Sequence, residues 1–187
     1  GIYPSSVHDQ YDDTLPLYPV VSFGRDIENQ FRARYGYPIE SVFVYLFLGE
    51  GEIAKKARYD YYRLLSDLYE QSYFAQLSNW CDRHGLPFSG HILLEDDIRH
   101  HVVFEGNFFA LLRHMHVPGI DMLHSIPTKV YNDAFTPKLV SSIAHAYGRP
   151  HVMSEVLAHA QGGKVTPMQM YASMSLQYAL GVDIFTS

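Results

Sequence analysis

Short apolar runs between turn residues recur through the second half of the chain. The clearest is Gly90-His91-Ile92-Leu93-Leu94-Glu95-Asp96-Asp97, which ends in three consecutive carboxylates. Such a run is typical of a buried parallel strand, whose carboxyl end is where α/β enzymes place their chemistry. His151-Val152-Met153-Ser154-Glu155 repeats the layout. The pattern predicts strands over 88–94 and 151–155, each with a glutamate at its end.

Two further runs, 118–123 and 181–185, are also predicted strands. Helices are expected over 106–114, from Thr136-Pro137 to Gly148, and from Thr166-Pro167 to Leu180, because threonine followed by proline is typical of an N-cap and the first helical position. Strands that alternate with helices at about thirty-residue spacing indicate a parallel sheet with right-handed crossovers.

The fold class predicted from this alternation is α/β, and the strands are interpreted as part of a (β/α)8 barrel. Four strands do not close an eight-stranded barrel of about 250 residues. We therefore expect residues 1–187 to be a single α/β catalytic domain or an interior portion of one. An open α/β sheet of four or five strands is the structural alternative. The segment 124–135 is expected to be a loop.

The first part of the chain is predicted to be an irregular lead-in over 1–24 followed by helices. Asp26 is the expected N-cap of a helix that ends near Tyr35, with Gly36 as the stop. The apolar run 39–48 fits either a strand or a helix, because its pattern has neither period clearly.

A long amphipathic helix is predicted from residue 52 to residue 84. Apolar residues recur there at three- to four-residue steps, with one longer gap between Leu68 and Phe74. Gly85 is a natural residue for the helix end. At 1.5 Å per residue the helix would be roughly 50 Å long, so we expect a kink or an overhang.

The composition is that of a globular protein and disfavours polyanionic partners. Hydrophobic residues make up 47% of the chain and the formal net charge is −6, which gives no general attraction for nucleic acid or an anionic membrane. No apolar run approaches the roughly twenty residues that cross a bilayer, and Gly1-Ile2-Tyr3-Pro4 lacks the regions of a signal peptide. Cys81 is the only cysteine, so an intrachain disulfide is ruled out.

Aromatic residues are unusually frequent and favour a carbohydrate partner. The chain has 15 Tyr, 11 Phe and one Trp, accompanied by 11 His. Aromatic faces stack on sugar rings, and Tyr and His supply hydrogen bonds. The alternative is that Tyr and Phe fill the core, which they do more often than they bind sugars.

Glu95 and Glu155 are the predicted catalytic residues. Glycoside hydrolysis needs one carboxylic acid to protonate the leaving oxygen and one carboxylate to attack or to activate water. Glu95 is interpreted as the acid, because repulsion from Asp96 and Asp97 would keep it protonated, and Glu155 as the base or nucleophile. The reverse assignment stays open. Either glutamate alone is also compatible with a helix N-terminus or a surface ion pair.

Further polar residues at or beyond the predicted strand ends are expected to bind the sugar: His91, Asp96, Asp121, His124, His159 and Asp183. Asp96 and Asp97 also offer the hard oxygen ligands that Ca²⁺ prefers. No histidine pair has a recognised zinc-ligand spacing with a third partner, so no metal ligands are assigned. No phosphate-binding glycine loop or serine-nucleophile motif is present, which disfavours nucleotide cofactors and serine catalysis.

Several segments together resemble the catalytic domain of bacterial glycoside hydrolases related to α-L-rhamnosidase family 106. They are Phe31–Tyr37, Arg58–Tyr61, Trp80–Leu86 up to the Glu95 run, Ser142–Gly148 and Ser154-Glu155. The resemblance implies a (β/α)8 barrel, inverting removal of a terminal rhamnose, assistance by calcium, and a bacterial periplasmic or secreted location. It also implies that the two glutamates are the catalytic pair. Where that family tends to have Glu-Pro-Tyr-Gly, this chain has Leu94-Glu95-Asp96-Asp97.

The sequence therefore predicts a glycosidase that acts on a carbohydrate substrate. The alternative from another class is a non-catalytic carbohydrate-binding or structural α/β fragment, which would show aromatic stacking without a facing pair of carboxylates.

Overall fold

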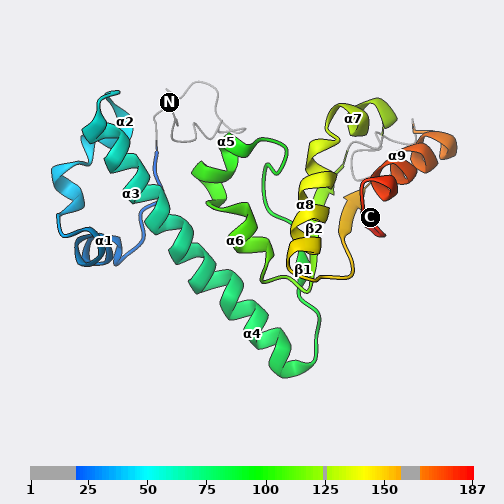
Figure 1. Ribbon diagram of the computed structural model, residues 1–187, viewed down its shortest axis with the longest axis horizontal. Coiled ribbons are helices and arrows are strands. Elements are labelled where there is room, and N and C mark those ends of the chain that lie inside the picture. The colour runs from blue at the N-terminus through cyan, green and yellow to red at the C-terminus, as the bar shows by residue number, and fades with distance from the viewer. Residues whose placement is uncertain (1–19, 124–125, 157–164) are drawn as a thin grey trace, which may run out of the picture. The chain divides into compact units, whose positions relative to one another are not determined.

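The computed structural model describes residues 20–123, 126–156 and 165–187 (Figure 1). These residues form two compact units. The first contains the described residues up to Tyr69 together with Val102–Gly106, and the second contains the rest. Within the described ranges no helix combines the length and the apolar character needed to span a membrane.

The first unit is helical. Its elements are α1 (Ile27–Tyr35), the 3-10 turn η1 (Ile39–Ser41), α2 (Val44–Phe47) and α3 (Glu52–Tyr69). The predicted bounds of α1 are confirmed, and Gly36 ends it with a φ of 78°. Asp26, however, accepts a hydrogen bond from the Asn29 side chain (2.7 Å) instead of capping the helix backbone.

Aromatic side chains make much of the core of this unit. Phe31 and Tyr61 are fully buried, and Ile39 and Leu46 pack with them from the segment whose structure the sequence left open between strand and helix. That segment is helical, because its apolar residues face α3 in two short turns. Burying a phenylalanine of this kind contributes about 1.5–3 kcal/mol.

The predicted long helix is interrupted by one π-helical turn. α3 is followed by η2 (Glu70–Phe74), a π-helix, and then by α4 (Ala75–His84), which ends at Gly85 with a φ of 64°. The π turn lies between Leu68 and Phe74, where the spacing between successive apolar residues is longer than the three or four residues of an uninterrupted α-helix. A π-helical turn holds one more residue than an α-helical turn, so it accommodates this longer spacing.

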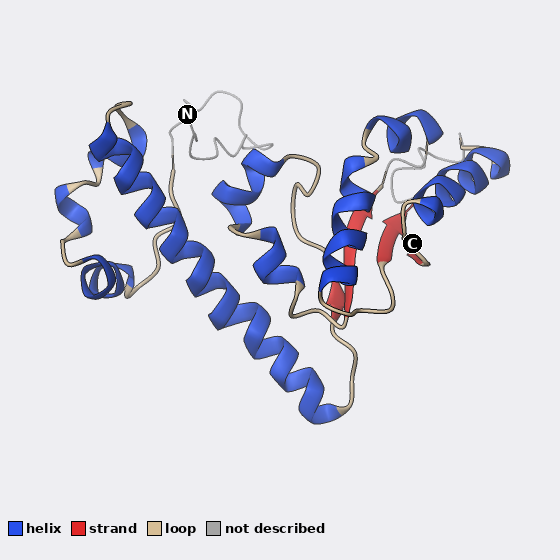
Figure 2. Cartoon of the chain, in the orientation of Figure 1, coloured by secondary structure: helices blue, strands red, loops and turns tan. Residues whose placement is uncertain are grey.

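The second unit contains a parallel sheet whose strands alternate with helices, which confirms the predicted α/β class. The described strands are β1 (Ser89–Gly90), β2 (Val117–Met122), β3 (Met153–Val156) and β4 (Ile184–Thr186). All neighbouring pairs are parallel, and the order in the sheet is the order in the chain. Figure 2 shows the strands in red; β2 passes behind a long helix, and β3 lies to the right of that helix.

Helices follow each strand up to β3. They are α5 (Ile98–His100), the π-helix η3 (His101–Glu105), α6 (Phe108–Leu112), α7 (Pro127–Asn132), α8 (Phe135–Ala146) and α9 (Pro167–Ala179). The expected loop at 124–135 was wrong, since α7 occupies most of its described part. The predicted cap of α8 was also wrong: the helix begins at Phe135, and Thr136 lies inside it.

The most consequential correction concerns the first strand. The sequence predicted a strand over 88–94, but β1 has only two residues and turns follow it from Leu93 to Asp96. Leu94 has a φ of 57°, the left-handed conformation that bulky residues rarely adopt. The run is apolar because Ile92 packs into the core, while the turn brings Glu95 back toward the sheet.

The centre of the sheet is tightly packed. Ile120 on β2 is fully buried, as are Leu111 and Leu112 on α6 and Ile143 on α8. A Cβ on Gly119 would lie 2.5 Å from the backbone oxygen of Gly90, so only glycine lets β1 and β2 approach this closely. This approach fixes the position of the residues that follow β1.

Candidate functional site

Polar side chains from three neighbouring strands meet at the carboxyl edge of the sheet. His91 follows β1 directly, Asp121 is the fifth residue of β2, and Glu155 is the third residue of β3. The sheet register pairs Asp121 with Glu155. Because parallel strands end at the same edge, residues far apart in the sequence are brought together there.

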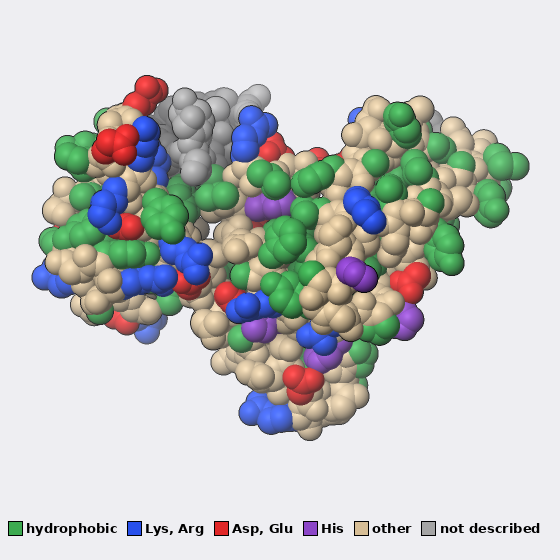
Figure 3. Space-filling model, viewed as in Figure 1, with side chains coloured by type: hydrophobic (Ala, Val, Ile, Leu, Met, Phe, Trp, Pro, Cys, Tyr) green, Lys and Arg blue, Asp and Glu red, His purple; other side chains and the backbone are tan. Residues whose placement is uncertain are grey.

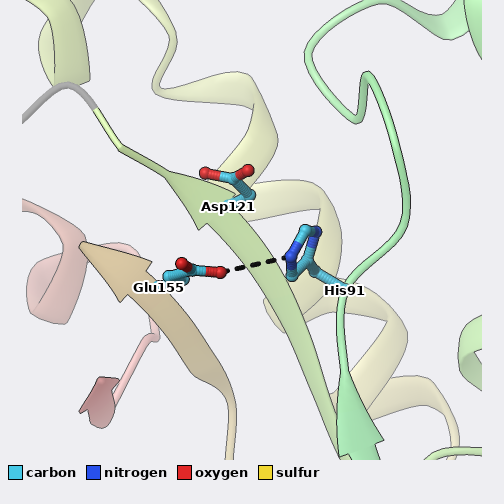
Figure 4. Close-up of side chains that lie close together, drawn as sticks. All are labelled: His91, Asp121 and Glu155. Atoms are coloured by element: carbon cyan, nitrogen blue, oxygen red, sulfur yellow. Dashed lines mark ion pairs between the residues drawn. The ribbon is translucent and has the colours of Figure 1, made fainter. Parts of the chain in front are cut away.

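The ring of His91 lies between two glutamates. Its Nδ1 is 3.1 Å from Oε1 of Glu95, and its Nε2 is 3.3 Å from Oε2 of Glu155. Figure 4 shows the Glu155 carboxylate pointing at the imidazole, with Asp121 beside both. The two glutamates predicted from the sequence are therefore joined through a single side chain.

Glu95 is buried and held from several sides. Its side chain is only 6% exposed, and Oε1 also accepts a hydrogen bond from the backbone N–H of Asp121 (3.2 Å). The backbone oxygen of Glu95 accepts a hydrogen bond from Nε2 of His101 (2.8 Å). The His101 ring is stacked on Phe108, with 4.6 Å between the ring centroids. These contacts fix the turn that carries Glu95.

The acidic surroundings favour the charged form of His91. The hydrogen bond to Glu95 is the largest contribution, and with the backbone oxygen of Ile92 and the charge of Asp121 it outweighs the opposing effect of burial. Together these contacts raise the pKa of His91 to about 9. At neutral pH the imidazolium therefore donates a hydrogen bond from Nδ1 to Glu95 and forms an ion pair through Nε2 with Glu155.

One of the two aspartates on which the assignment of Glu95 as the acid rests is paired with a cation. Asp97 caps α5 through the backbone N–H of Arg99 and pairs with the Arg99 guanidinium at 2.8 Å, which lowers the pKa of Asp97 well below its usual range. With its carboxylate engaged by Arg99, Asp97 neither repels Glu95 strongly nor offers free oxygens to Ca²⁺. Asp96 is exposed, and its charge acts with that of Glu95 on Asp133.

Asp183 was predicted at the site, but it lies at the opposite end of the parallel strands, where the strands begin. It precedes β4 instead of following a strand, and it contacts His151 (2.7 Å) and the backbone N–H of Val152 (2.8 Å). The prediction was wrong because β4 begins at Ile184, three residues later than expected. His124 and His159 lie outside the described residues.

Two residues of the site region were missed by the sequence analysis. His101 supports the backbone of Glu95, as described above. Asp133 lies in the connection between α7 and α8, and burial, followed by the charges of Asp96 and Glu95, raises its pKa. Its hydrogen bond from Thr136 (2.8 Å) ties it to the start of α8. Neither residue belongs to a local motif that could have revealed it.

His91, Asp121 and Glu155 also have the arrangement of metal ligands. One nitrogen and two carboxylate oxygens lie within 4.8 Å of one another. Two carboxylates and one imidazole are a common donor set for divalent transition metals.

The fold and site define an α/β protein with a histidine-centred acidic site at the carboxyl edge of a parallel sheet. Comparison with protein-family models, curated proteins and solved structures finds no match to the chain.

Proposed function

We propose that the protein is a glycoside hydrolase in which Glu95 and Glu155 form the catalytic pair. One observation carries the proposal: both carboxyl groups converge on one imidazole, 3.1 and 3.3 Å from its two nitrogens, at the edge where α/β enzymes place their sites. The sequence resemblance favours an α-L-rhamnosidase-like activity on a plant or microbial polysaccharide.

We also propose that the four strands belong to a (β/α)8 barrel. In a barrel each strand pairs with the next one in the chain, whereas a doubly wound sheet reverses its order at a switch point. The order β1-β2-β3-β4 supports the barrel, and so does the position of the site at the carboxyl ends.

Glu155 is the better candidate for the acid and Glu95 for the base. Glu95 already accepts hydrogen bonds from two N–H groups, which suits an acceptor better than a proton source. The Glu155 side chain is 36% exposed, so a sugar reaches it first. This reverses the roles inferred from the sequence.

Inversion is the outcome that the sequence resemblance implies, and it needs a water between the sugar and the base. A water would attack the anomeric carbon and lose its proton to Glu95. The leaving oxygen would take a proton from Glu155, which receives it from Nε2 of the His91 imidazolium, as the glycosidic bond breaks.

Hydrolysis of an aryl-glycoside panel that includes the α-L-rhamnoside tests the proposal. We expect Glu95→Gln and Glu155→Gln each to lower kcat/KM by about 10²–10⁴-fold. Asp183→Asn is the matched control, because Asp183 lies at the other edge of the sheet, and it should hydrolyse the same substrate at the wild-type rate. Equal rates in the wild type and both glutamate variants would refute catalysis by this pair.

A non-catalytic carbohydrate-binding role is the second candidate, and exposed aromatic side chains favour it. Tyr131 on α7 and Tyr171 on α9 are 72% and 70% exposed, and hydrophobic side chains gather over these helices at the upper right of Figure 3. Exposed aromatic rings stack on sugars. Polysaccharide binding that is lost in Tyr131→Ala, with no hydrolysis by the wild type, would favour this role.

A further inference from the structure

We propose that His91, Asp121 and Glu155 form a binding site for a divalent transition-metal ion of the Zn²⁺ or Co²⁺ type. The inference does not depend on glycoside hydrolysis, since the binding can be measured without any sugar. It also departs from the calcium that the sequence resemblance implies.

The geometry of the three side chains fits one ion. Ligand atoms that bind Zn²⁺ at about 2.0–2.2 Å lie roughly 3.4 Å from each other around a tetrahedral ion. Nε2 of His91 and Oε2 of Glu155 are 3.3 Å apart, and all three ligand atoms lie within 4.8 Å of one another. Three protein ligands leave a position for water, as in catalytic zinc sites.

The ligands are oriented by contacts behind them. Nδ1 of His91 is held by the buried Glu95 carboxylate, so Nε2 is the nitrogen that faces Asp121 and Glu155. This is the carboxylate–histidine–metal arrangement in which an outer carboxylate fixes the ring and makes it a stronger ligand. Oδ1 of Asp121 accepts from the backbone N–H of Leu123 (3.2 Å), which turns its carboxylate in the same way.

The charge of the site also favours a cation. Glu95, Asp121 and Glu155 surround a single imidazole, so carboxylates outnumber the positive charge. A divalent ion would balance these carboxylates more fully than a single imidazole does.

The donor set distinguishes between metals. Ca²⁺ and Mg²⁺ bind oxygen ligands, and Ca²⁺ takes six to eight of them. Imidazole nitrogen suits Zn²⁺, Co²⁺ and similar ions. A site with His91 as one of three ligands therefore does not fit Ca²⁺.

Titration of the whole chain, stripped of metal with a chelator that is then removed, tests the site. Isothermal titration calorimetry with Zn²⁺ and the visible absorption of Co²⁺ report binding and coordination directly. We expect one ion per chain and no competition by Ca²⁺. His91→Gln should weaken Zn²⁺ binding at least about 100-fold, and Glu95→Gln, which leaves all three ligands in place, about 10–100-fold.

His151→Gln is the matched control, because His151 also faces a carboxylate, that of Asp183 at 2.7 Å, but at the other edge of the sheet. It should leave Zn²⁺ affinity unchanged. If His91→Gln fails to fold by circular dichroism, Asp121→Asn and Glu155→Gln decide the question. Binding that persists at wild-type affinity in the folded ligand variants, or equal affinity for Ca²⁺, would overturn the inference.

Discussion

His91 is expected to titrate near pH 9, and Glu95→Gln should move its pKa most of the way toward the ordinary value. The structure raises the pKa of His91 to about 9, with the Glu95 hydrogen bond as the largest cause. At about 1.4 kcal/mol per pH unit, the difference between a pKa of about 9 and the ordinary value of about 6.5 corresponds to about 3.5 kcal/mol. Because the side chain is 32% exposed, solvent screening reduces the contribution to about 1–2 kcal/mol.

The sign of the pH dependence follows from the raised pKa. The folded pKa lies above the unfolded one, so the stabilisation is fully present below about pH 6.5 and is lost as the pH rises through about 9. Urea unfolding at about pH 6 and about pH 10 should show a loss about 1–2 kcal/mol larger in the wild type than in Glu95→Gln.

Nuclear magnetic resonance titration of the imidazole C–H signals, with a chelator present, measures the His91 pKa itself. The His91 signal is assigned by its disappearance in His91→Gln, which serves as the control. A pKa near 6.5 in the wild type, or one that stays near 9 in Glu95→Gln, would refute the proposed coupling.

Three further sets of substitutions test the packing that positions the site. The effect of each on the free energy of unfolding is measured from the midpoint of urea unfolding. Gly119→Ala should destabilise by about 1–3 kcal/mol, because its Cβ would lie 2.5 Å from the backbone oxygen of Gly90, and it should weaken Zn²⁺ binding by displacing β1. Ile120→Ala should cost about 2–5 kcal/mol and Ile120→Val about 0.5–1.5 kcal/mol; equal costs would contradict full burial. Thr166→Ala should cost about 0.5–2 kcal/mol, because Thr166 and Gln169 form a capping box, and Thr166→Ser should retain stability.

The elements predicted well were those with strong local signals. Thr166 followed by proline marks the start of α9, and the αL glycines Gly36, Gly85 and Gly148 end their helices as expected. Such signals act within one turn of the chain and need no tertiary contact.

The elements predicted poorly depend on contacts between distant segments. The apolar run after Gly90 matches a buried strand, and only the packing of β1 against Gly119 shows that the chain turns away after two residues. Asp183 was misplaced because β4 begins three residues later than predicted. The residue therefore precedes the strand and lies at its amino end.

Only part of the candidate site was predicted, because the site also depends on contacts between distant segments. The position of Glu155 at the carboxyl end of its strand follows from the alternating pattern, whereas Glu95 reaches the same place through the turn after β1. The role of His91 does not follow from that pattern, because Asp121 and Glu155 follow it on two later strands and no short motif joins the three residues. A tertiary arrangement of this kind is visible only when the register of β2 and β3 is known.

Glu155 links the two proposals and makes them compete. As a general acid it must carry a proton, whereas as a metal ligand it must be deprotonated. The same applies to Nε2 of His91, which carries a proton in the ion pair with Glu155 and must lose it to bind an ion. A bound ion would therefore remove the protonated pair that the proposed hydrolysis uses. The two proposals together predict two mutually exclusive states of the site, a protonated one suited to acid–base chemistry and a metal-bound one.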